Sequence, residues 1–185
     1  MWRRYRDGFR LIVVWSHVHT SSHVLAAVSS AFSGVLRPGP EDIIHCEYDR
    51  AWGGPLEGPC RECTEVVEFF RKAARIGLPP SALSDVAHGL ASFTPKAFAF
   101  WLPAFIEVSL CSDQAGWRCR ESIDFRLRSL ESEAWQKEHI GALNSQQLGS
   151  LRMYFEYLRE DPGEDPELID EALSTLTKWE CGGGK

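Results

Sequence analysis

The sequence predicts a mainly α-helical, compact single domain in which six or seven helices pack around one apolar central helix. Two observations predict this class: a strongly apolar stretch over 93–110, and amphipathic segments with helical spacing on both sides of it. The chain has 185 residues, 44% of them hydrophobic and 25% charged, which suits one ordinary globular domain. The pattern leaves room for one or two short strands.

The central helix is predicted over 93–110, which reads FTPKAFAFWLPAFIEVSL. Thr94 and Pro95 form a helix start, because a threonine side chain accepts an amide hydrogen bond at the N-cap and proline fits the first helical position. Apolar side chains recur behind them at helical spacing: Phe98, Trp101, Leu102, Phe105 and Ile106. Pro103 has no amide hydrogen to donate to the Ala99 carbonyl, so we expect a kink there.

The flanking helices are predicted from capping residues, glycine and proline stops, and amphipathic spacing. They are expected over 21–33, 61–75, 144–160 and 165–179, with a further helix from residue 80 or 81 to about 90. Residues 122–128 instead alternate Ile123, Phe125 and Leu127 with charged side chains, a period of two that indicates a half-exposed strand. A second short strand is expected at Ile43–Ile44.

The ends of the chain differ from the predicted domain over 21–180. Residues 1–20 are expected to form an N-terminal arm and 181–185 a flexible tail. The apolar run LIVVW near the start is too short for the core of a signal peptide, and no run reaches membrane-spanning length. Six scattered cysteines favour reduced thiols over a secreted disulfide scaffold. These features predict a cytoplasmic protein with no membrane partner.

Negative charge is concentrated near the C-terminus. The whole chain carries a formal net charge of −6, which argues against general nucleic-acid binding. Residues 156–180 hold nine acidic side chains against Arg159 and Lys178, a local balance of −7. An acidic helix is most often a solvated face, but such a face also steers a basic partner toward its docking site.

Cys60 and Cys63 form the sharpest chemical motif, because two thiolates at this spacing can bind one zinc ion. His45 and Cys46 in the preceding loop could complete a tetrahedral site. These two are adjacent in sequence, however, and adjacent residues rarely bind the same ion. A redox function would need a thioredoxin-like strand pattern, which is missing. Ordinary cysteines are therefore the favoured interpretation, with a zinc site or another catalytic use of the 41–63 loop as an alternative.

Seven tryptophans are many for one small domain. Trp52 lies in the loop sequence AWGGPLEGP, and Trp117 and Trp135 also fall outside the clear helical stripes. Exposed tryptophans in loops make good anchors for a partner protein, although many such residues only cover the edge of a core.

Several segments resemble, in the same order, a family of bacterial proteins that carries a domain-of-unknown-function label. The family hallmark is a segment of the type LTPEAFRYYLPAYL, which here reads FTPKAFAFWLPAFI over 93–106. Weaker similarities are AFSGVLRPG, ECTEVVEFF, LNSQQLGSLRMYFEYL and the final IDEAL…W, and together they cover about 22–180. The resemblance implies a small, mainly helical bacterial protein of the cytoplasm and transfers no catalytic residue. Such domains often occur near toxin–immunity genes, which sets only an expectation.

The preferred function is non-enzymatic binding of a protein partner, in the specific form of an immunity-type inhibitor of a basic effector. No nucleophile elbow, phosphate-binding glycine loop or HExxH motif occurs in the sequence. The expected binding residues are Trp52, Glu164, Asp165, Asp170 and Glu171. A metal-binding or catalytic protein is the first alternative, and a structural or oligomerisation module is the second.

Overall fold

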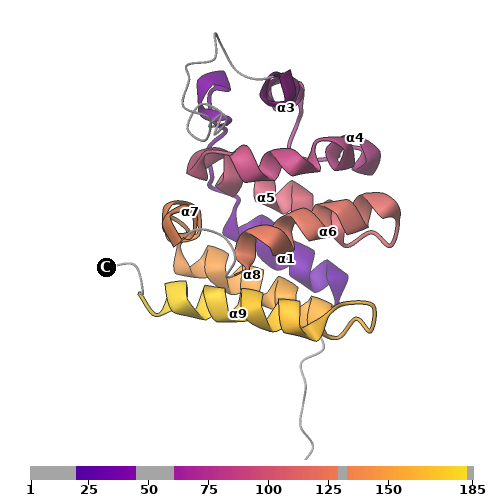
Figure 1. Ribbon diagram of the computed structural model, residues 1–185, viewed down its shortest axis with the longest axis vertical. Helices are drawn as coiled ribbons and strands as arrows, with labels where there is room; N and C mark the ends of the chain where they lie inside the picture. The colour runs from indigo at the N-terminus through magenta and orange to yellow at the C-terminus, as the bar shows by residue number, and fades with distance from the viewer. Residues whose placement is uncertain (1–19, 45–60, 129–132, 183–185) are drawn as a thin grey trace, which may run out of the picture.

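α5, which runs from Pro95 to Ser109, lies at the centre of the molecule. In the computed structural model, which describes residues 20–44, 61–128 and 133–182, this helix contacts α1 (Ser21–Ala31), α4 (Pro80–Asp85), α6 (Gln114–Leu127) and α7 (Glu133–His139) (Figure 1). The remaining elements are α3 (Arg61–Lys72), α8 (Ser145–Arg159), α9 (Pro166–Glu180) and the 3-10 turns η1 (Pro40–Asp42) and η2 (Ala87–Ser92). Seven of these helices have seven residues or more within the described part of the chain. The mainly helical single domain is thereby confirmed.

The start and the burial of α5 follow from its sequence. Thr94 is the N-cap and accepts a hydrogen bond from the Ala97 amide at 3.1 Å, while Pro95 takes the first helical position. Most of the helix is buried, and Trp101 is among the largest side chains shut away from solvent. A helix that is apolar on nearly every side is stable only when other elements cover it. Pro103 lies inside α5, and the kink expected there stays a prediction.

Aromatic side chains join α5 to two segments that precede it in the chain. The ring of Phe70 on α3 lies 4.9 Å from Phe93 and 4.8 Å from Trp101, measured between ring centroids. Phe105 completes the cluster from the next turn of α5. Edge-to-face and tilted contacts of this kind add to the free energy gained by burying the rings.

α8 and α9 form an antiparallel pair at the opposite end of the stack from α3 (Figure 1). Asn144 and Gln147 close the predicted capping box of α8, with hydrogen bonds of 2.9 and 3.0 Å. α1 packs on α8, and α6 packs on α9 as well as on α5. The connection between α8 and α9, residues 160–165, therefore comes to lie next to α6.

The strand predicted over 122–128 is wrong, because 122–127 form the last part of α6 and Arg128 is its C-cap. Cys119, Ile123 and Leu127 recur every four residues and are buried, whereas Phe125 is 47% exposed. Ile123 and Leu127 therefore belong to the buried stripe of a helix, and Phe125, which lies between them in sequence, points toward solvent.

Two smaller expectations also change. The helix expected from residue 80 to about 90 is split into α4 and η2, and Ile44 forms an isolated β-bridge to Phe93 rather than a strand. No strand forms within the described residues, nor does any of their helices have the length and apolarity needed to cross a membrane. The arm over 1–20 lies outside the described residues except for residue 20, and the last three residues of the tail, 183–185, lie outside them as well.

Candidate functional site

α6 supplies most of the candidate site, and two residues determine where it begins. Asp113 is the N-cap, and its side chain accepts a hydrogen bond from the Gly116 amide at 2.9 Å. A Cβ atom at Gly116 would lie only 1.9 Å from the carbonyl oxygen of Cys111. Glycine is required there because it alone lets the first turn of α6 approach the end of α5 so closely.

The side of α6 that faces the α8–α9 connection carries a row of polar and aromatic residues. Each of them lies three or four positions from another member of the row, so they share one side of the helix. The row consists of Trp117, Arg120, Glu121, Asp124 and Arg128.

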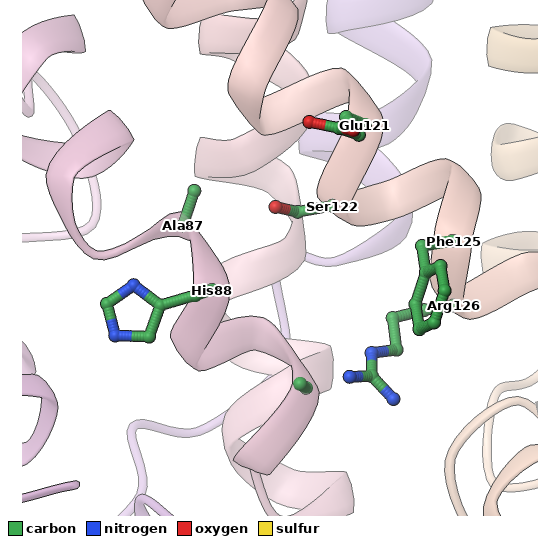
Figure 2. A pocket seen from close by; sticks show the side chains of 7 residues that line it. Ala87, His88, Glu121, Ser122, Phe125 and Arg126 are labelled. Carbon is green, nitrogen blue, oxygen red and sulfur yellow. The ribbon is translucent and has the colours of Figure 1, made fainter. Parts of the chain in front are cut away.

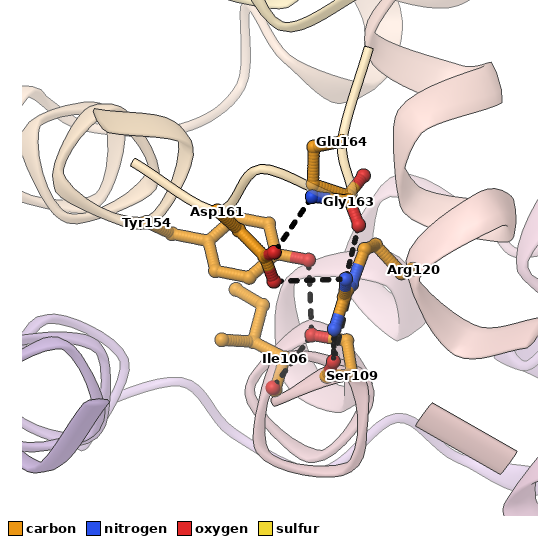
Figure 3. Close-up of polar contacts among 7 residues, drawn as sticks. All are labelled: Ile106, Ser109, Arg120, Tyr154, Asp161, Gly163 and Glu164. Atoms are coloured by element: carbon orange, nitrogen blue, oxygen red, sulfur yellow. Dashed lines mark hydrogen bonds and ion pairs between the residues drawn. The ribbon is translucent and has the colours of Figure 1, made fainter. Parts of the chain in front are cut away.

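Arg120 ties α6 to the end of α5 and to the α8–α9 connection (Figure 3). Its Nη2 donates to the carbonyl oxygen of Ser109 at 2.7 Å, and its Nη1 donates to the carboxylate of Glu164. Asp161 lies 3.9 Å from the same Nη1. Burial acts to lower the pKa of Arg120, but the hydrogen bond and the charge of Glu164 outweigh it and raise that pKa. The arginine is therefore a permanent cation.

Ser109 and Tyr154 extend this network into the core. The two hydroxyl groups lie 2.9 Å apart, and the Ser109 hydroxyl also donates to the Ile106 carbonyl at 2.7 Å (Figure 3). Burial, followed by the charge of Asp124, raises the pKa of the Tyr154 phenol. Tyr154 is thus a neutral hydrogen-bonding group that links α8 to α5.

Two cavities share Trp117, Arg120, Gly163 and Glu164. The larger, about 400 Å³, extends toward the end of α5, and the smaller, about 290 Å³, extends along α6 to Arg128. Six carboxyl groups and two guanidinium groups line the pair of cavities: Asp113, Glu121, Asp124, Asp161, Glu164 and Asp165, with Arg120 and Arg128. This excess of acids makes the region suitable for a cationic group.

Asp124 is the buried member of the row. Only 6% of the residue is exposed, and its Oδ1 has no hydrogen-bond partner among the described residues. Burial, with a smaller contribution from the charge of Glu164, raises the pKa of its carboxyl to about 7, although Arg128 and Arg120 act in the opposite direction. Asp124 therefore changes its charge near neutral pH.

A third hollow lies on the other side of α6, against η2 (Figure 2). It has a volume of about 260 Å³ and is lined by His88, Glu121, Ser122, Phe125 and Arg126, among others. Figure 2 shows Phe125 and Arg126 side by side, and the Arg126 guanidinium carbon is 5.1 Å from the Phe125 ring centroid. Glu121 lines this hollow and the smaller cavity alike, so α6 separates two concave surfaces.

Four of the predicted binding residues fall into two groups. In the first group, Glu164 and Asp165 line the smaller cavity. Glu164 pairs with Arg120, and Asp165 caps α9 by accepting a hydrogen bond from the Glu167 amide at 3.0 Å. Asp170 pairs with Arg159 at 3.0 Å, and Glu171 is exposed on α9; neither lines that cavity. Trp52 lies outside the described residues.

The metal site proposed from the sequence also lies mostly outside the described residues. His45, Cys46 and Cys60 belong to 45–60, while Cys63 is half-buried on α3. Within residues 20–44, 61–128 and 133–182, no group of three or more histidine, cysteine or acidic side chains is placed to hold a metal ion. The zinc alternative therefore stays a prediction.

Sequence reasoning did not single out Arg120, Asp124 or Arg128. Their spacing does indicate a shared helix face, because these residues recur every four positions from Arg120 onward and Trp117 lies one turn before them. The period-two interpretation of 122–128 concealed this signal, because it placed Asp124 on the solvent side of a strand.

Comparison of the chain with protein-family models, with curated proteins and with solved structures finds no match. The resemblance to the bacterial family with the LTPEAFRYYLPAYL-type segment therefore stays a prediction. The function must be argued from the geometry of this chain.

Proposed function

We propose that this protein is a non-enzymatic binding protein that docks a basic protein partner on the outer face of α6. The observation that carries the proposal is the exposure of two large aromatic side chains on that face. Trp117 is 56% exposed and Phe125 is 47% exposed. They are separated by two turns of helix with Glu121 between them, so all three lie along one stripe. Exposed aromatic residues beside concave surfaces are the anchors that protein interfaces favour.

The charge around this stripe indicates the chemistry of the partner. The cavities beside Trp117 carry six carboxyl groups against two guanidinium groups, and one of these arginines is already paired with Glu164. A second copy of this chain would bring a like-charged face against them, which costs free energy. A partner with lysine or arginine side chains at its interface is attracted instead. Its association is accelerated at low ionic strength.

The most specific form of the proposal is an immunity-type inhibitor that covers a basic effector. Such a protein needs a rigid, acidic surface and no reacting groups of its own. α6 meets the first requirement because Asp113, Gly116 and Arg120 hold its first two turns against α5. Glu164 and Asp165, two of the residues predicted from the sequence, contribute acidic groups beside this helix.

The test uses the immobilised full-length chain and a native lysate of the source cells. We expect the wild type to retain a protein with a basic isoelectric point. The double variant W117S/F125S should retain about tenfold less, because it removes both aromatic anchors. Replacing Glu121 by lysine should also weaken capture, and raising the ionic strength should reduce it further, since rim charges act through screened attraction.

The matched control is the double variant L36S/I76S. Leu36 and Ile76 are 78% and 80% exposed, so this variant also removes two exposed apolar side chains, but neither belongs to α6 or lines a cavity beside it. It should retain the partner as the wild type does. The proposal would be contradicted if both double variants captured equally less partner. It would also be contradicted if the captured partner were acidic and high salt did not weaken its capture.

A further inference from the structure

The smaller cavity beside α6 contains a buried acceptor that the chain itself leaves unused. Asp124 lines this cavity of about 290 Å³, is 94% buried, and has no hydrogen-bond partner for Oδ1 among the described residues. A buried carboxyl oxygen without a partner costs free energy, because it has given up its bonds to water. Such a group in the wall of a cavity indicates that something from outside the chain can complete it.

The cations nearest to Asp124 are not placed to pair with it. Arg120 is engaged by Glu164 and by the Ser109 carbonyl. Arg128 lies one turn further along α6, and its buried Nε has no hydrogen-bond partner among the residues that the structure describes. No ion pair of 4.0 Å or less joins Asp124 to a cation in the same part of the chain.

We propose that this cavity binds one guanidinium group, with the Asp124 carboxylate as its acceptor and the Trp117 indole as a wall. The group is presented by an arginine side chain of the basic partner, so this inference rests on the proposed function. The cavity is slightly smaller than the usual range for drug-sized ligands, which suits a single inserted side chain. Glu121 and Asp165 stand at the same cavity and add negative charge around the inserted group.

A guanidinium group fits these surroundings better than an ammonium group. It is planar, so it can lie against an indole, and its parallel N–H groups match a carboxylate. It is also more weakly hydrated, so less free energy is lost when it leaves water for a partly enclosed site.

Binding should depend on pH because the acceptor must be ionised. The groups that face Asp124 are Arg120 and Glu121 on α6, Arg128 at the C-cap of α6, Tyr154 on α8 and Glu164 on the α8–α9 connection. A carboxyl with a pKa of about 7 is mostly neutral at pH 5.5 and mostly ionised at pH 8. At the lower pH the bound cation must displace the proton of Asp124 into solvent, which weakens binding.

The experiment titrates the full-length, ¹⁵N-labelled chain with ethylguanidinium, kept below denaturing concentrations. The indole N–H signal of Trp117, assigned with a W117F variant, reports on the cavity. At pH 8 we expect a saturable shift of this signal, with an affinity roughly tenfold or more above that at pH 5.5. The variant D124N should lose this binding and its pH dependence. The control E138Q, which alters an exposed acid on α7 that lines neither cavity, should bind as the wild type does.

Three results would overturn the inference: no saturable shift at pH 8, equal binding by D124N, or equal affinity for ethylammonium. These are distinct from failure of the proposed function. If ethylguanidinium binds but W117S/F125S still captures the partner, the cavity is correct and the docking face is wrong. If the partner is lost with W117S/F125S but D124N captures it while no longer binding ethylguanidinium, the docking face is correct, and the assignment of the bound group to an arginine of the partner is wrong.

Discussion

Asp124 illustrates how one buried residue can link stability to binding. Its carboxyl lies at the boundary between the core and an acid-lined cavity, where neither water nor a neighbouring cation solvates its charge fully. The free chain therefore bears a cost that a bound cation would remove. Residues of this kind are common at functional sites, because a group that is stabilised only by its ligand also makes the protein sensitive to that ligand.

The first prediction concerns the stability of the free protein. The folded-state pKa of Asp124 is about 7, above the ordinary value of 3.8, so the folded state holds the proton more tightly than the unfolded state. Stability from this group is therefore present at low pH and is lost as pH rises toward 7. Between pH 5 and pH 8 the wild type should lose about 3 kcal/mol relative to D124N. Urea unfolding of both proteins at the two pH values measures this difference, and parallel pH profiles would refute it.

The second prediction compares two arginine–carboxylate pairs. Arg120 and Glu164 are 14% and 16% exposed, whereas Arg159 and Asp170 are each about half exposed. Removing Arg120 leaves Glu164 and the Ser109 carbonyl without their partner in a partly buried place. We expect Arg120→Ala to cost about 3 kcal/mol and Arg159→Ala less than about 1 kcal/mol. Chemical denaturation measures both losses, and similar values for the two variants would contradict the structural role of Arg120.

At the scale of elements, α6 connects the core to the candidate site. One side buries Cys119, Ile123 and Leu127, and the other presents Trp117 and Phe125. The helix can serve both purposes only if its start is held at one distance from α5. Gly116 sets that distance, because the backbone of Cys111 occupies the space that a side chain would need.

The third prediction follows from this close approach. Gly116→Ala should destabilise the protein by about 3 kcal/mol, because the obstacle is backbone and cannot rotate away. Gly149→Ala on α8 is the matched control, since nothing lies within 4 Å of the added methyl group. That substitution should stabilise the protein by about 0.5–1 kcal/mol through helix propensity alone. Thermal unfolding of the two variants distinguishes these opposite signs, and a neutral Gly116→Ala would show that α6 can slide away from α5.

The elements that sequence analysis predicted best are those with local signals. Three helices start where their capping residues predict: α5 at Thr94–Pro95, α8 at Asn144 with Gln147, and α9 at Asp165–Pro166. α6 was misread at its end because three alternating apolar residues fit a strand and a helix equally well over so short a range. Packing against α5 and α9 decides which of these three residues faces solvent. That packing cannot be predicted from the local sequence.

At the scale of the whole molecule, the candidate site depends on contacts between distant parts of the chain. Glu164 could be proposed from the sequence because acids gather visibly near the C-terminus. The role of Glu164 could not be predicted from the sequence, because its contact with Arg120 joins residues 44 positions apart. Asp124 was missed for the same reason: it lies where α6 packs against α9 and the α8–α9 connection. Composition predicted an acidic surface, and tertiary structure placed one part of that surface beside an exposed tryptophan.

The last prediction concerns the oligomeric state and separates partner binding from the structural-module alternative. Trp117 and Phe125 are exposed, and exposed aromatic patches can drive self-association. Here the same face carries an excess of carboxylates, so two copies would oppose like charges across the contact. We therefore expect a monomer of 20.9 kDa by light scattering at neutral pH and low ionic strength. A dimer that W117S/F125S converts to a monomer would show that this face binds a second copy and would contradict the choice of a basic partner.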